Sequence, residues 1–195
     1  MVQGPGDVKS WKQELPSVGA VRPSHCPRCR RPSRETGQRI TLHGHGVRRR
    51  QQRGPEEPEG KPVEAEIVGR RFRCILCRAV IIVVPHGVLP HRHYGAGAIA
   101  LAAALYGVDQ RPVTEVRQRV STWDAGGTFG WITLRRWLRS IRCGELFPGI
   151  RRCPTEWTPR QVAARAATTL AGWAPPSFCG LPVRAQAFHG ASRQA

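Results

Sequence analysis

The sequence has few acidic residues. It contains 13 aspartates and glutamates against 31 lysines and arginines, which gives a formal net charge of +18 at neutral pH. Only three residues are lysine, so nearly all of the positive charge is arginine. A chain this basic favours a polyanionic partner. An anionic membrane surface is the weaker alternative, because no amphipathic basic helix is evident.

The sequence also lacks long apolar segments. The longest covers residues 95–108, which is 14 residues and falls short of the roughly 20 that a membrane-spanning helix needs. Residues 1–20 contain no apolar stretch of the kind found in secretory leaders. These absences predict a cytoplasmic protein, in a compartment where paired cysteines hold metal more often than they form disulfides.

Catalytic motifs are missing as well. The sequence contains no phosphate-binding loop and no G-x-S-x-G motif. A two-metal centre needs several clustered carboxylates, and beyond residue 143 the only ones are Glu145 and Glu156. We therefore expect a binding protein rather than an enzyme.

Two cysteine pairs have the spacing of a metal site. Cys26 and Cys29 form one C-x-x-C pair, and Cys74 and Cys77 form the other. Four thiolates from two tight turns surround a zinc ion tetrahedrally and leave no position open for water. The spacing therefore predicts a structural zinc site that supplies folding free energy. The alternative is that the pairs are incidental or redox-active.

The pattern around these pairs predicts an α+β protein that begins with a zinc ribbon. Residues 1–24 are polar and contain scattered Gly, Pro and Ser, which predicts a flexible arm. Residues 25–94 hold both cysteine pairs and two strand-like segments, at about 39–49 and 63–73, which form a β-hairpin. Residues 51–60, between these strands, are expected to be an irregular insertion.

Residues 95–143 have the periodicity of a helix-turn-helix module. Helices are predicted over 98–106, 112–120 and 131–142, and a glycine-bearing turn over 121–130 precedes the last one. The third helix has an apolar stripe that would pack on its own domain, so its polar face could enter the major groove of DNA.

The last part of the chain, residues 144–195, is predicted to contain one short helix and a disordered tail. The helix covers 159–171, and Thr158 precedes it as a candidate N-cap. The last twenty residues are expected to be disordered.

Arginines on the hairpin and on the third helix are the candidate contacts to nucleic acid. Guanidinium groups can pair with guanine or bind phosphates, although a solvated amphipathic face is the alternative for the helix. The candidates are Arg48, Arg49, Arg50, Arg71, Arg73, Arg135, Arg136, Arg139 and Arg142.

Histidines offer a different hypothesis. The pairs His43/His45 and His91/His93 could serve a small nuclease or a second metal site. No carboxylate lies near them in the sequence to orient metal ligands, which weighs against this hypothesis.

Together the motifs resemble the N-terminal region of bacterial insertion-sequence transposases, and they are similar to transposase-like zinc-ribbon proteins. The resemblance covers about residues 25–143. It rests on Cys26-Pro27-x-Cys29, Arg71-Phe72-Arg73-Cys74-x-x-Cys77, a Pro-rich turn at Leu89-Pro90 with Tyr94, and Thr133-Leu134-Arg135-Arg136-Trp137-Leu138. It implies a zinc ribbon followed by a helix-turn-helix module that binds duplex DNA. The chain lacks the family's catalytic domain, so the resemblance implies a DNA-binding accessory or remnant without strand-transfer activity.

Two points qualify this resemblance. Arg78 stands where a glycine usually closes the second cysteine turn, a departure that concerns the tight backbone turn and not the metal ligands. A basic zinc ribbon also suits folded RNA, so an RNA- or ribosome-associated protein is the alternative.

Overall fold

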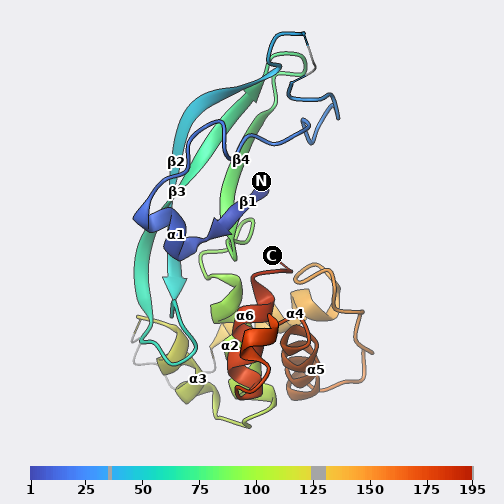
Figure 1. The fold of residues 1–195 in the computed structure, drawn as a ribbon. Coiled ribbons are helices and arrows are strands. Elements are labelled where there is room, and N and C mark those ends of the chain that lie inside the picture. Colours follow the sequence, from blue (N-terminus) through green and yellow to red (C-terminus); the bar gives the residue numbers. More distant parts are fainter. Residues whose placement is uncertain (35–36, 124–130, 195) are drawn as a thin grey trace.

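The computed structural model describes residues 1–34, 37–123 and 131–194, and shows a long sheet standing on a group of helices (Figure 1). The strands are β1 (Val2–Asp7), β2 (Leu42–Gly54), β3 (Val63–Cys74) and β4 (Val80–His86). The helices are α1 (Val8–Gln13), α2 (Ala96–Gly107), α3 (Val113–Val120), α4 (Ile132–Arg142), α5 (Pro159–Ala171) and α6 (Val183–Ala191), with a 3-10 turn at Pro176–Phe178. The predicted α+β class is confirmed.

The predicted hairpin is present and is longer than expected. The sheet has the strand order β1-β4-β3-β2, in which β2 and β3 are antiparallel and pair from Leu42 opposite Cys74 to Gly54 opposite Val63. The prediction that residues 51–60 are irregular is wrong for 51–54, which continue β2. Arg53 lies opposite Glu64 and forms an ion pair with it, and such cross-strand pairs stabilise a sheet.

The predicted flexible arm, residues 1–24, is also wrong. β1 pairs in parallel with β4, and Asp7 caps α1 by accepting the backbone N–H of Ser10 at 2.8 Å. Trp11 in α1 is 5% exposed and donates its indole N–H to the carbonyl of Pro5. Burial of this large side chain against the sheet is the reason that the segment is ordered.

The predicted helices are confirmed, and further helical structure follows them. α2, α3, α4 and α5 correspond to the four expected helices, and Thr158 caps α5 in a capping box with Gln161. The predicted turn over 121–130 lies mostly outside the described residues. Where the structure describes the chain, no helix is long and apolar enough to cross a membrane.

The expected disordered tail instead contains α6. Phe188 in this helix is 8% exposed and packs over Gly97 of α2, where an added Cβ would lie 2.9 Å from the ring. One hydrophobic core runs from Leu89 to Ala191, and α2 packs against both α5 and α6. The helices before and after residue 143 therefore share a single core, rather than forming a separate three-helix module and a tail.

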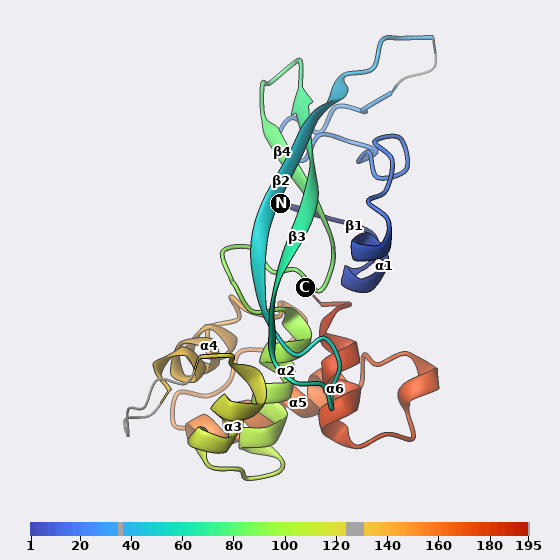
Figure 2. The same cartoon turned by 90° about the vertical axis from the view of Figure 1, so that its left-hand side faces the viewer.

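The loop between β2 and β3 joins the sheet to the helices. It reaches in among the helices (Figure 2), and Glu59 at its end forms ion pairs with Arg119 of α3 and Arg184 of α6, at 3.2 and 3.1 Å. Gly54 lies against α2, because a Cβ there would be 2.4 Å from the Cβ of Ala98. The insertion thus forms the base on which the hairpin stands.

Candidate metal centre and nucleic-acid interface

The four paired cysteines meet at one point of the sheet. Their Sγ atoms all lie within 4.8 Å of one another, with Cys26 and Cys77 at 3.6 Å and Cys29 and Cys74 at 3.8 Å. A tetrahedral ion with metal–sulfur distances of about 2.3 Å separates its sulfurs by about 3.8 Å. A disulfide would need about 2.0 Å, and all four cysteines are free. The cluster therefore has the dimensions of a four-cysteine metal site.

The backbone forms the same turn in both cysteine pairs. The N–H of Cys26 donates to the carbonyl of Arg31, and the N–H of Cys74 donates to the carbonyl of Ala79, both at 2.9 Å. Arg30 and Arg78, each following the second cysteine of its pair, have φ of 60° and 59°. Both arginines occupy the left-handed region that glycine favours, so the turn closes at Arg78 without a glycine.

Two thiols of the cluster have pKa values that are shifted in opposite directions. Burial raises the pKa of Cys26, but N–H donors of Cys29 and Arg28 outweigh burial and lower it to about 7. The N–H of Ala79 lowers the pKa of Cys77, but burial and hydrogen bonds with the neighbouring thiols raise it to about 11. Four thiolates this close repel one another unless a cation balances them. The cluster is thus suited to a soft metal ion.

The metal centre is part of the core of the sheet. Cys26 and Cys74 are buried in a cluster with Trp11, Leu42 and Phe72, whereas Cys29 and Cys77 are partly exposed. This arrangement fixes the two turns against the rigid hairpin.

Elsewhere in the described residues, no group of three or more metal-binding side chains comes together. His43, His45, His91 and His93 are all exposed. A second metal site or a histidine nuclease therefore has no assembled centre in the part of the chain that the structure shows.

Three of the predicted arginine contacts are already engaged within the protein. Arg49 forms an ion pair with Glu66 at 2.8 Å. Arg50 is partly buried and donates to the carbonyl of Arg92, and burial lowers its pKa. Arg142 donates to the carbonyls of Thr155 and Trp157. Arg50 and Arg142 therefore support the fold, and a neighbouring carboxylate offsets the charge of Arg49.

The other predicted arginines remain available to a partner. Arg71 is partly exposed and the rest are exposed. Their side chains form no hydrogen bond or ion pair with any residue that the structure describes. They are Arg48, Arg71, Arg73, Arg135, Arg136 and Arg139.

A larger basic surface surrounds the cysteine turns and was mostly missed from the sequence. We call it the arginine tip, and it consists of the exposed residues Arg28, Arg30, Arg31, Arg34, Arg39, Arg73 and Arg78. None of these forms an ion pair within the described ranges. For all of them except Arg34 and Arg39, the signal that could have found them is their position within two residues of a paired cysteine, because the metal turns bring both sequence segments to one end of the sheet.

The second available basic surface is on α4. Its exposed face carries Arg135, Arg136 and Arg139, which we call the α4 set. The opposite face is buried, as predicted, and includes Trp137, whose ring contacts Trp131 edge-on with 5.0 Å between the ring centroids. The predicted amphipathic helix is therefore confirmed, whereas its role in binding stays a prediction.

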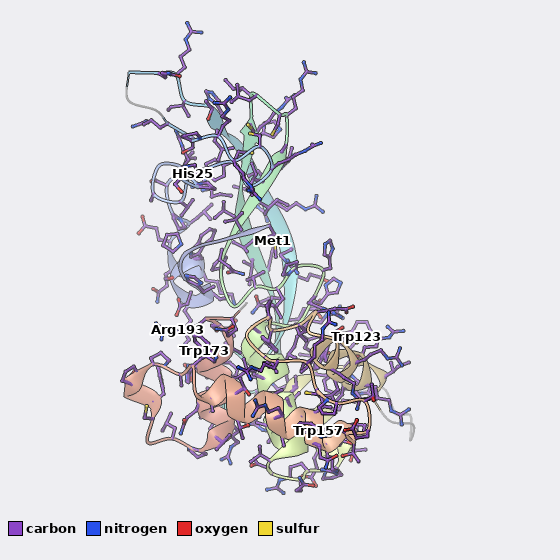
Figure 3. The ribbon with its side chains drawn as sticks, turned by 90° about the vertical axis from the view of Figure 1, so that its right-hand side faces the viewer. Met1, His25, Trp123, Trp157, Trp173 and Arg193 are labelled. Carbon is purple, nitrogen blue, oxygen red and sulfur yellow. The ribbon has the colours of Figure 1, made fainter. Side chains whose placement is uncertain are left out.

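The two basic surfaces lie at opposite ends of the molecule. Figure 3 shows His25, beside the first cysteine pair, in the upper part and Trp123 among the helices. β2, which runs between these ends, has 13 residues and spans about 40 Å. No protein family, curated protein or solved structure matches this chain. Its function must therefore be inferred from these two surfaces and the cysteine cluster.

Proposed function

We propose that this protein is a zinc-dependent DNA-binding protein without strand-transfer activity. One observation carries this proposal: seven exposed arginines surround the four-cysteine cluster and have no carboxylate partner in the described residues. Such a concentration of unpaired positive charge attracts phosphates. Cytoplasmic location and the absence of catalysis belong to the same proposal.

Zinc is the metal that we assign to the cluster. Cys26, Cys29, Cys74 and Cys77 would hold it, and the sulfur separations of 3.6 and 3.8 Å support a tetrahedral thiolate site. Such a site binds no water, so the metal would hold the turns in place and take no part in chemistry. Metal analysis should find one zinc ion per chain, lost in Cys74→Ser and retained in Cys143→Ser, whose exposed cysteine lies outside the cluster. A folded protein that contains no metal would contradict this assignment.

Duplex DNA fits the distance between the two basic surfaces. About 40 Å along β2 corresponds to about 12 base pairs of duplex. A helix with exposed arginines, such as α4, is narrow enough to enter the major groove. The arginine tip would then contact phosphates of the same duplex about one helical turn away. Structured RNA is the alternative, and competition between RNA and duplex DNA distinguishes the two.

The test is the salt dependence of binding. Replacing Arg28, Arg31 and Arg73 together with alanine should reduce the slope of log affinity against log salt by about 3, since each phosphate contact contributes about 0.9. The matched control replaces Arg111, Arg151 and Arg165, which are exposed arginines of the helical part, and loses the same charge. Equal effects of the two triple variants would show that net charge alone drives binding. Unchanged affinity in the tip variant would refute the proposal.

A further inference from the structure

The second cysteine turn exposes aliphatic side chains in the middle of the arginine tip. Ile75 and Leu76, between Cys74 and Cys77, are 53% and 56% exposed, and Val80 nearby is 50% exposed. Single exposed aliphatic residues are common on protein surfaces. Here Ile75 and Leu76 are adjacent on one turn, and Val80 begins β4 opposite Arg73, one of the exposed arginines of the tip. An apolar patch with a cationic rim is suited to a partner that has both apolar and anionic groups.

Hydrogen bonds hold the backbone of this turn in place. The backbone N–H of Ile75 donates to the carbonyl of Thr41, and the N–H of Cys74 donates to the carbonyl of Ala79, both at 2.9 Å. Cysteines of the metal cluster flank the two residues on both sides. Little conformational entropy is therefore lost when Ile75 and Leu76 contact a partner.

We propose that Ile75 and Leu76 form a wedge that contacts unstacked or unpaired bases, while the arginine tip binds the phosphates on either side. This inference rests on the proposed function and names its preferred substrate class: duplexes with a mismatch or a bulge. Base faces are apolar and phosphates are anionic, which matches both components of the tip. Apolar side chains flanked by cations are known to separate base steps.

Energetics explain why damaged or mismatched duplexes would be preferred. Separating two stacked base pairs costs a few kcal/mol, and the cost is lowest where pairing is already broken. Arginines bind the phosphates of matched and mismatched duplexes equally well. Discrimination between the two duplexes must therefore come from the contact of Ile75 and Leu76 with the bases. Only at a mismatch or bulge does this contact form without the full free-energy cost of unstacking.

The experiment compares two labelled duplexes of about 24 base pairs, twice the length that β2 spans. One is fully matched, and the other carries a central mismatch beside a fluorescent base whose emission rises when it unstacks. The wild-type protein is compared with the double variant Ile75→Ala/Leu76→Ala. The control is Val63→Ala/Leu181→Ala, whose residues are also aliphatic and are 39% and 43% exposed outside the turn. Zinc content is measured for each protein to confirm that the turns are intact.

We expect the wild type and the control to bind the mismatched duplex with about tenfold higher affinity than the matched duplex. This factor corresponds to burying half of the two side chains of Ile75 and Leu76. The double variant should lose this preference and the fluorescence increase, and keep its affinity for the matched duplex. A wild type that binds both duplexes equally, or a double variant that still discriminates, overturns the wedge and leaves the proposed function standing.

Two other outcomes also decide the matter. If the wild type binds neither duplex, the proposed function fails together with the wedge. If Ile75 and Leu76 affect only the binding of an acidic, apolar peptide used as competitor, the partner of this patch is a protein and the wedge is refuted.

Discussion

Replacing Arg78 with glycine should stabilise the protein and weaken its binding to DNA. Arg78 has φ of 59°, a left-handed conformation that costs a non-glycine residue roughly 1 to 2 kcal/mol. Glycine removes this strain but makes the unfolded chain more flexible, which costs about 0.4 to 1 kcal/mol. The net gain is about 0.5 to 1 kcal/mol. The same change removes one of the seven arginines of the tip, so the salt slope of binding should fall by about 0.9.

Thermal unfolding of the zinc-loaded protein measures the first effect. For a chain of this size, 1 kcal/mol shifts Tm by about 2 to 4 °C, so we expect Arg78→Gly to raise Tm by about 2 °C. A titration of labelled duplex at several salt concentrations measures the second effect. The variant is expected to be more stable and to bind DNA more weakly. A general loss of structure would lower both stability and binding, so it cannot explain this result.

Arg28→Gly is the matched control. It removes an exposed arginine of the first cysteine turn, where the φ angle is not left-handed. It should weaken DNA binding by a similar amount and lower the stability, because glycine there relieves no strain and only adds freedom to the unfolded chain. If Arg78→Gly destabilises the protein as much as Arg28→Gly does, the strain argument is refuted.

Three further predictions test the parts of the fold that position the tip. Asp7→Ala should destabilise by about 1 kcal/mol because it removes the cap of α1. The N–H of Ser10 lowers the pKa of Asp7 below its ordinary 3.8. The contribution of the cap to the free energy of unfolding is therefore present above pH 3.8 and is lost as pH falls through the folded pKa. Unfolding measured between pH 2 and 6 should show this loss only in the wild type. Glu59→Gln should cost about 1 kcal/mol in denaturant unfolding, since one carboxylate serves two arginines. Phe188→Ala should lower the free energy of unfolding by about 3 kcal/mol. Leu181→Ala, at an exposed position, should change it by less than about 0.5 kcal/mol. Similar small losses in both variants would contradict the packing of α6.

Local signals made part of the fold predictable from the sequence. The start of α5 follows from Thr158 and Gln161, which satisfy backbone groups within one turn of the helix. The cysteine cluster follows from the spacing of its pairs, because each turn brings its own two thiols together. The buried stripe of α4 follows from its helical periodicity.

The missed elements depend on residues far away in the sequence. α1 is held by Trp11, which packs near Gly4 and Val83, and α6 is held by Phe188, which packs over Gly97. α1 has only six residues and α6 shows only weak hydrophobic periodicity, so their burial could not be predicted from the local sequence. Long-range contacts of this kind override the polar composition that suggested an arm and a tail.

The same limit applies to the candidate site. Arg49 and Arg50 belong to a run of three arginines, and Arg142 follows Arg139 by three residues on the same helix. Only the three-dimensional structure shows that these arginines already have partners. Conversely, Arg34 and Arg39 lie outside any motif. Two backbone hydrogen bonds, from Thr41 to the carbonyl of Ser33 and from Ile75 to the carbonyl of Thr41, bring this part of the chain to the second cysteine turn. Charge patterning predicted a basic protein but could not separate structural arginines from available ones.

The contacts of the β2–β3 loop with the helices determine the direction in which the hairpin and its arginine tip point. β2 and β3 carry the cysteine cluster about 40 Å from the loop where Glu59 and Gly54 contact the helices. A tilt of roughly 10° at that loop would move the tip by about 7 Å, which is two base-pair steps of DNA. Changes in the length of this loop could therefore shift the spacing between the two contacts on a duplex without altering a single arginine.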